Sequence, residues 1–124
     1  MKDKAHHHLD IYLEGWRLGD PHRSLSVLTP DFHYDDPNTG RIFVDGFVAF
    51  MEAFKTDAAA LNNGKIGTPF LSYTDITADR DHAWCWWRAT DTDLQGAALI
   101  HFDHTGIVSE RIAYFSALPK GVQT

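Results

Sequence analysis

The spacing of apolar residues changes once along this chain, near Gly67. Before that point apolar side chains recur at i, i+3, i+4 and i+7, which is typical of amphipathic helices, and after it they alternate with a period of two, which is typical of β-strands. The spacing predicts one helix over residues 6–18 and another that begins near Phe47 with Asp45 as its cap. A short helix is expected between them, after the Asp-Pro pair at 20–21.

The expected strands follow the helices, apart from one early strand over residues 32–36. Their ranges are about 68–78, 82–91, 95–104 and 107–117, with tight turns near residues 79–81, 91–93 and 105–106. Strands joined by such short turns pair antiparallel. Helices segregated from an antiparallel meander predict an α+β domain in which the helices pack on one face of a curved sheet.

The length and charge of the chain restrict its partners. With 124 residues we expect a single domain over residues 1–124. The formal net charge is −6 and no stripe of Lys and Arg is present, which argues against a nucleic-acid partner. The apolar runs are shorter than the roughly 20 residues of a spanning helix, and the first residues are too polar for a secretory signal. Together with the lone Cys85, this favours a cytoplasmic protein with a small-molecule partner and no membrane partner.

Three stretches of the sequence carry a family resemblance that spans nearly the whole chain. They are YLEGWRLGD (Tyr12–Asp20), LTPDFHYDDP (Leu28–Pro37) and HFDHTGIVSERIAYF (His101–Phe115). In this order and spacing they resemble the nuclear transport factor 2-like superfamily, and within it the SnoaL-like polyketide cyclases and ketosteroid isomerases. The resemblance implies a cone-shaped, curved mixed or antiparallel sheet, the cystatin-like α+β roll, wrapped around the N-terminal helices. It also implies an apolar cavity and a homodimer through the outer sheet face.

The resemblance further implies two catalytic residues, Tyr12 and Asp36. Isomerases of this type use a Tyr on the first helix, an Asp before the Pro that ends the first strand, and a second acid on the penultimate strand. Tyr12 and Asp36 match the first two positions, whereas the third falls at Ile100. Because Ile cannot donate a hydrogen bond, this departure argues against isomerase activity itself but leaves the cavity and its base in place.

The residues themselves leave two interpretations of each matched position. Asp36 shares a strand face with Phe32 and Tyr34, so its carboxylate would point into an aromatic space and act as a general base. Alternatively, an Asp before Pro initiates a turn by binding nearby backbone amides. Tyr12 lies on the buried stripe of its helix, where its hydroxyl either donates to a ligand oxygen or binds a protein carbonyl group.

The aromatic strand HAWCWWRA supplies the expected cavity wall. Alternation places Trp84, Trp86 and Arg88 on one face, and we expect this bulkier set to face the cavity. A buried Arg88 would pair with Glu110 or would bind a ligand carboxylate at the cavity mouth. The other expected substrate-binding residues are Trp16, Tyr34, Ile100, Phe102, Glu110 and Tyr114.

The histidines are not expected to form a metal site. Residues 6–8 are three consecutive histidines that point about 100° apart on a helix, so they cannot converge on one ion. His101 lies on the outer sheet face if Ile100 faces inward, and a shift of one residue in register would make it a second candidate base. We therefore expect neither a metal nor an organic cofactor.

Two functions of different classes remain open. The first is a cofactor-independent isomerase, cyclase or dehydratase that moves a proton next to a carbonyl group of a small, largely apolar molecule. Asp36 would be its base, and Tyr12 would stabilise the oxygen. The second is a non-catalytic module of the same fold that binds an apolar ligand or only dimerises, which Ile100 favours.

Overall fold

The helices of this protein precede the main run of strands in the computed structural model, which describes residues 3–115. The helices are α1 (Lys4–Leu18), α2 (Pro21–Leu25) and α3 (Phe47–Ala60), with a short 3-10 helix, η1 (Val44–Gly46), before the last. The strands are β1 (Leu28–Asp36), β2 (Gly40–Phe43), β3 (Leu71–Ala78), β4 (His82–Ala89), β5 (Gln95–Asp103) and β6 (Gly106–Tyr114). The predicted helices and strands are confirmed, although residues 116–117 of the last predicted strand lie outside the described residues. No helix of the described part is long and apolar enough to cross a membrane.

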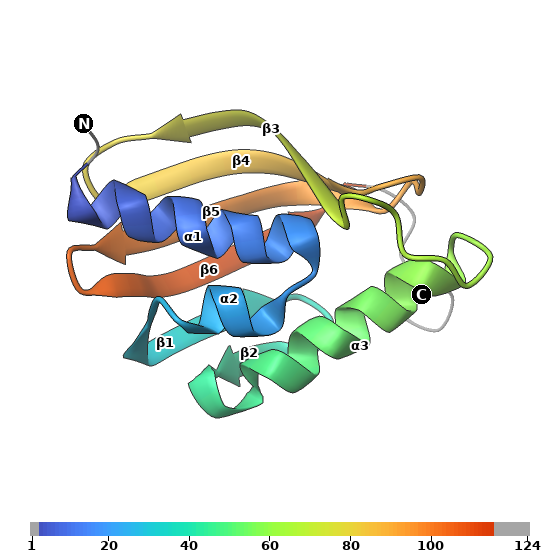
Figure 1. Ribbon diagram of the computed structural model, residues 1–124, viewed down its shortest axis with the longest axis horizontal. Coiled ribbons are helices and arrows are strands. Elements are labelled where there is room, and N and C mark those ends of the chain that lie inside the picture. The colour runs from blue at the N-terminus through green and yellow to red at the C-terminus, as the bar shows by residue number, and fades with distance from the viewer. Residues whose placement is uncertain (1–2, 116–124) are drawn as a thin grey trace.

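The six strands form one curved sheet in the order β2-β1-β6-β5-β4-β3. β1 and β6 are parallel, and every other neighbouring pair is antiparallel. Figure 1 shows the helices gathered on one face of this sheet, with α1 lying over the meander and running roughly along its strands. The predicted α+β architecture, a curved mixed sheet with helices on one side, is therefore confirmed.

Strand β2 and helix η1 are the two described elements that the apolar pattern does not predict. The four residues of β2 are mostly exposed, and they pair only with β1 at the edge of the sheet. Only Ile42 of this strand packs against the core, so no alternation of apolar and polar residues marks so short a strand.

The helix ends follow their sequence signals, with one exception. α1 ends at Gly19, whose φ of 68° is left-handed, and Asp20 caps α2 by accepting a hydrogen bond from the Arg23 backbone nitrogen at 3.2 Å. The predicted capping role of Asp45 for α3 is wrong. Asp45 lies inside η1, and the inserted 3-10 turn places Gly46 at the N-cap position without a side-chain hydrogen bond.

Gly15 allows α1 and α2 to pack directly against each other. A Cβ atom at this position would lie 2.0 Å from Ser24 Oγ and 2.6 Å from the Ser24 backbone nitrogen. Ser24 is buried, and its hydroxyl donates to the Tyr12 carbonyl oxygen at 2.8 Å. The two helices therefore meet at a point where a larger side chain does not fit.

Trp16 lies at the centre of an aromatic core between α1, α3 and β1. Its ring contacts Tyr34 at a centroid distance of 5.7 Å and meets Phe47 and Phe54 edge-on at 5.9 and 5.6 Å. The predicted helical stripe of Phe47, Phe50 and Phe54 is buried. Burial of these rings holds α3 against the sheet, because each large apolar side chain contributes about 1.5–3 kcal/mol when it leaves water.

The predicted inward orientation of Trp84, Trp86 and Arg88 is wrong. Along β4 the alternate residues are buried instead, and Trp84 and Trp86 are 52% and 39% exposed on the outer face. The reason is the register with β5, in which Ala83 pairs with the buried Ile100. Paired residues on antiparallel strands point to the same side of the sheet, so Ala83 faces the helices and its neighbour Trp84 faces away.

Candidate functional site

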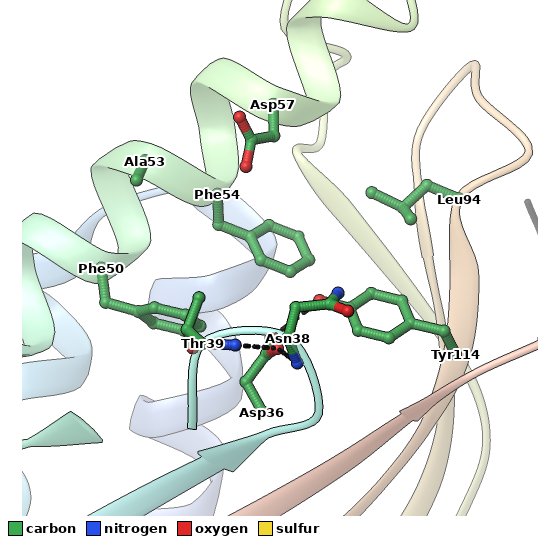
Figure 2. A pocket seen from close by; sticks show the side chains of 9 residues that line it. All are labelled: Asp36, Asn38, Thr39, Phe50, Ala53, Phe54, Asp57, Leu94 and Tyr114. Carbon is green, nitrogen blue, oxygen red and sulfur yellow. Dashed lines mark hydrogen bonds between the residues drawn. The ribbon is translucent and has the colours of Figure 1, made fainter. Parts of the chain in front are cut away.

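A cavity of about 70 Å³ opens beside the turn that follows β1. Figure 2 shows this turn, at Asn38 and Thr39, facing α3 across the cavity, with Tyr114 on a third side. The nine residues that line the cavity are Asp36, Asn38, Thr39, Phe50, Ala53, Phe54, Asp57, Leu94 and Tyr114. The ends of two strands, two loops and one helix therefore build a single site.

The cavity has an apolar floor and a polar rim. Phe50, Phe54 and Leu94 are buried, whereas Asn38 and Asp57 are exposed at the mouth. The volume leaves room for only a few non-hydrogen atoms of a ligand, since one water molecule occupies about 30 Å³ in the liquid. A small apolar group inside and a polar group at the rim match this arrangement.

Asp36 is the acid of this cavity and is only 4% exposed. Oδ1 accepts the backbone N–H groups of Asn38 at 2.7 Å and Thr39 at 3.2 Å, and Oδ2 accepts the hydroxyl of Tyr114 at 2.7 Å. Three donors around the group fit an ionised carboxylate, which has about four acceptor positions. One position on Oδ2 is therefore left for a ligand. Asp36 forms the turn, as the second interpretation of its sequence position predicts, and it also faces the cavity. Its role as a general base stays a prediction.

Tyr114 binds the second oxygen of Asp36 and forms one wall of the cavity. Burial raises the pKa of Tyr114 above its ordinary value, and the hydrogen bond to Asp36 and its negative charge raise it further. Asp57 acts in the same direction, whereas the Asn38 side chain lowers the pKa. The hydroxyl therefore stays protonated near neutral pH and remains a hydrogen-bond donor.

Tyr12 does not line the cavity but donates its hydroxyl to Oε1 of Glu110 in the core. Both side chains are buried. Burial raises the pKa of Glu110 to about 8, and the hydrogen bond from Tyr12 acts in the opposite direction. Glu110 faces inward as predicted, but the predicted pair with Arg88 is wrong, because Arg88 is exposed on the outer face.

Only part of the predicted site is brought together. Asp36 and Tyr114 meet at the cavity, and Phe50 and Phe54 form the aromatic wall that was expected of the tryptophans. The remaining candidates lie elsewhere, with Trp16, Tyr34, Ile100, Phe102, Tyr12 and Glu110 in the core and Trp84, Trp86 and Arg88 on the outer face.

The contribution of α3 to the cavity is missed by the sequence patterns. Phe50 and Phe54 belong to a stripe that predicts core packing, and Asp57 is an exposed residue near the C-terminal end of the same helix. Their spacing of i, i+4 and i+7 places all three on one side of α3. An Asp that follows two Phe residues by seven and three positions on one helix is the sequence signal that could have identified α3 as a wall of the cavity.

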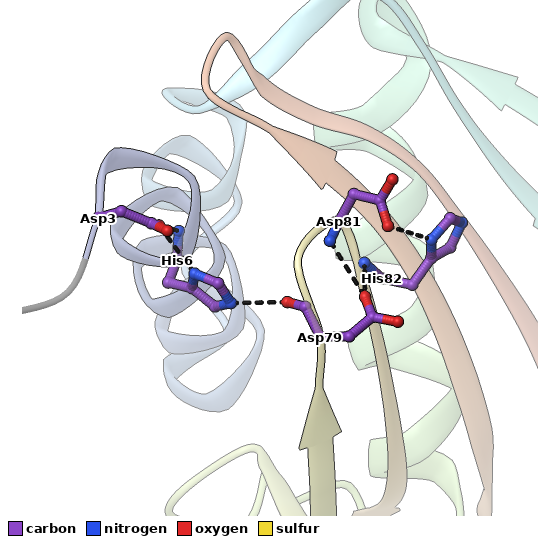
Figure 3. A network of polar contacts seen from close by, with 5 residues as sticks. All are labelled: Asp3, His6, Asp79, Asp81 and His82. Carbon is purple, nitrogen blue, oxygen red and sulfur yellow. Dashed lines mark hydrogen bonds and ion pairs between the residues drawn. The ribbon is translucent and has the colours of Figure 1, made fainter.

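A second polar group of residues surrounds the β3–β4 turn, as Figure 3 shows. Asp79, Asp81 and His82 bring one possible ligand atom each to within 4.8 Å of one another, and all three are exposed. Oδ1 of Asp79 accepts the backbone N–H groups of Asp81 and His82. Nε2 of His6 lies 2.8 Å from the Asp79 carbonyl oxygen. These contacts close the turn and tie the start of α1 to it.

Solved structures are similar to this chain over most of its length. A candidate ketosteroid isomerase from Kribbella flavida matches at 16% identity and a TM-score of 0.64, covering 92% of this chain and 79% of its own. A candidate polyketide cyclase from Xanthomonas campestris matches at 16% identity and a TM-score of 0.61, covering 90% of each chain. A nuclear transport factor 2-like protein of unknown function from Cytophaga hutchinsonii matches at 11% identity and a TM-score of 0.62, covering 93% of this chain and 95% of its own. This chain has the nuclear transport factor 2-like fold.

The nuclear transport factor 2-like fold is shown by structural likeness alone. No family model matches the sequence, and no curated protein is similar to it. Identities of 11–16% leave the activity open, because one fold carries many unrelated activities. The function of this nuclear transport factor 2-like chain has to be argued from the residues of its own cavity.

Proposed function

We propose that the chain binds a small, largely apolar molecule in the cavity and that Asp36 moves a proton at a carbon next to a carbonyl group. The observation that carries this proposal is a buried carboxylate at the wall of an apolar cavity, with one acceptor position on Oδ2 left for a ligand. Two structural neighbours are named for polyketide cyclase and ketosteroid isomerase chemistry, which supports the same class of reaction.

The proposed step needs only groups of this chain. The carboxylate of Asp36 takes the proton from carbon, the electron pair of the C–H bond moves into the carbonyl group as an enolate, and the proton then returns to the same or another carbon. Tyr114 positions Asp36 through its hydrogen bond, and the side-chain amide of Asn38 at the rim offers a donor to the carbonyl oxygen. The oxygen-stabilising role expected of Tyr12 passes to these residues in the proposal, because the Tyr12 hydroxyl is bound to Glu110.

The second candidate is a non-catalytic binding module. It is favoured by Ile100, which stands where the resemblance implies a second acid and which is buried away from the cavity. A ligand would then occupy the cavity without release of a product.

Deuterium exchange separates the two candidates. Acetylacetone and 3-pentanone are incubated with the protein in D₂O, and loss of the proton next to the carbonyl group is followed by NMR. The wild type is expected to accelerate exchange, and Asp36→Asn to return it to the rate in buffer. Asp35→Asn is the matched control, since Asp35 is on the opposite face of β1 and is bound to Arg41 at 2.8 Å.

Two results would remove the catalytic proposal. One is exchange by Asp36→Asn at the wild-type rate, and the other is exchange by the wild type at the buffer rate. In the second case, saturable shifts of cavity residues with the same ketones would support the binding module. Circular dichroism of each variant establishes that it is folded.

We further propose that two copies of the chain pair through the outer face of the sheet. The large apolar side chains of Trp84, Trp86, Leu99 and Phe115 are exposed there. Trp84 pairs in register with Leu99 on the neighbouring strand, and the ring of Trp86 contacts Phe115 at a centroid distance of 4.7 Å. Contiguous apolar patches of this kind mark interfaces, and a twofold dimer uses the same patch on both copies.

A further inference from the structure

Among residues 3–115, the charged side chains that line the cavity are all acidic. Asp36 lies at its wall and Asp57 at its mouth, and no Lys, Arg or His of this part of the chain lines the cavity. The cavity therefore presents negative charge on two sides of an apolar floor.

The basic side chains that are close in sequence to the lining residues are bound elsewhere. Nζ of Lys55 lies 2.8 Å from the Gly19 carbonyl oxygen and 3.2 Å from Glu52 Oε1. Arg41 is paired with Asp35 on the other face of β1. Within residues 3–115, Asp57 has no basic partner, so its charge is left for a ligand.

The aromatic side chains of the cavity wall also favour a positively charged ligand. Phe50 and Phe54 stand side by side on α3 with a centroid distance of 6.2 Å, and Tyr114 lies across the cavity. The faces of aromatic rings attract cations. The raised pKa of Tyr114, to which burial contributes first and both Asp36 and Asp57 then add, reflects the same negative potential.

We propose that the carbonyl compound taken by this cavity also carries an ammonium group, so that its short apolar part packs against Phe50, Phe54 and Leu94 while the ammonium group faces Asp57 at the mouth and Asp36 stays free to act as the base. This inference rests on the proposed function, because it names the class of molecule that the same cavity takes. Anionic ligands are disfavoured, since no basic side chain of the lining compensates their charge.

Three probes with one carbon skeleton test this selectivity. Isobutylamine is a cation, 2-methylpropan-1-ol is neutral and isobutyrate is an anion near neutral pH. Each is titrated at low ionic strength into the labelled protein, and the backbone amide shifts of Asn38 and Thr39 are followed by NMR. The amine is expected to bind at least about tenfold more tightly than the alcohol, and isobutyrate to give no saturable shift.

Two variants locate the effect. Asp57→Asn is expected to weaken binding of the amine by about 2- to 5-fold and to leave binding of the alcohol unchanged. Glu52→Gln is the matched control, because it changes the net charge equally on the same helix but lies outside the cavity lining. The two side chains are exposed, so neither change disturbs the core.

The possible results distinguish this inference from the function on which it rests. Equal binding of amine and alcohol, or equal weakening by Asp57→Asn and Glu52→Gln, would overturn the cation selectivity and leave the cavity as a binding site. No shift of Asn38 or Thr39 with any probe, together with no exchange of the ketones, would overturn both.

Discussion

Ile100 and Glu110 are paired directly across β5 and β6, and both side chains are buried beneath the helices. The acid that the sequence resemblance implies at Ile100 is absent, yet the adjacent strand places a carboxyl group beside that position. The carboxyl group of Glu110 accepts a hydrogen bond from the Tyr12 hydroxyl, so it belongs to the core and not to the cavity. Its burial has consequences for stability that can be measured.

The free energy of unfolding is expected to fall as the pH rises from about 5 to 8. Because burial raises the pKa of Glu110 to about 8, the folded state keeps a proton that the unfolded state releases near its ordinary pKa of 4.5. Raising the pH therefore favours unfolding, by up to about 1.4 kcal/mol per pH unit, and the loss levels off above the folded pKa. Urea denaturation at several pH values measures this slope.

The Glu110→Gln variant isolates the contribution of Glu110 to the pH dependence of stability. The amide keeps the shape of the side chain but does not titrate, so the variant is expected to lose the Glu110 part of the slope. All contributions to the slope that do not involve Glu110 are common to both proteins and cancel in the difference. Equal slopes for the variant and the wild type would contradict a raised pKa.

Tyr12→Phe is expected to destabilise the protein by about 1–3 kcal/mol, because it leaves buried Glu110 without its donor. In the Glu110→Leu background the same change should cost much less, since no carboxyl group then lacks a partner. A double-mutant cycle by urea denaturation gives the coupling energy. Additive effects would mean that the two side chains do not depend on each other.

Gly15→Ala is expected to destabilise the protein by about 2 kcal/mol or more. The added Cβ atom overlaps both the side chain and the backbone nitrogen of Ser24, so α2 would have to shift. Gly46→Ala is the control. A Cβ atom there meets only Ile42 Cγ2 at 3.5 Å. The expected loss of stability is therefore below about 1 kcal/mol, and it comes from replacing Gly at the N-cap of α3. Thermal unfolding of both variants tests the comparison, and equal losses would argue against close helix packing at Gly15.

Cys85 is expected to be unreactive in the folded protein. Burial raises the pKa of its thiol to about 12, with a further contribution from Glu110, and the side chain is fully enclosed. Reaction with an aromatic disulfide reagent at pH 8 should be at least about 100-fold slower in buffer than in urea, where the thiolate is accessible. Rapid reaction in buffer would show that β4 opens easily.

Trp84→Asp is expected to shift the protein toward monomers, because it places a charge in the proposed outer-face interface. Leu18→Asp, an exposed position on α1 on the helix side of the sheet, should leave self-association unchanged. Sedimentation at several protein concentrations measures both. A wild type that stays monomeric at high micromolar concentration would refute the interface.

The sequence predicts the elements well and the faces of one strand poorly. The i, i+3, i+4 and i+7 pattern places α1 and α3, and alternation places Phe32, Tyr34 and Asp36 together on the inner face. In HAWCWWRA large aromatic residues occupy both faces, so their bulk does not indicate which face is inside.

The position of the cavity also depends on information that periodicity does not contain. Asp36 and Tyr114 are 78 positions apart and meet only because β1 pairs parallel with β6. A spacing rule within one element cannot describe such a contact. Here the family resemblance indicated the acid, and Tyr114 was expected to bind substrate, whereas only the structure supplied its hydrogen bond to Asp36 and the wall from α3.

The parallel pairing of β1 with β6 also governs when this protein can finish folding on the ribosome. The β3–β6 meander can pair within itself, whereas β1 has only the short β2 as a partner until β6 has emerged. Contacts between strands so distant in sequence form late because a long loop must close first. Since Asp36 and Tyr114 lie at the ends of these two strands, the binding site is completed only after the chain has been synthesised through Tyr114.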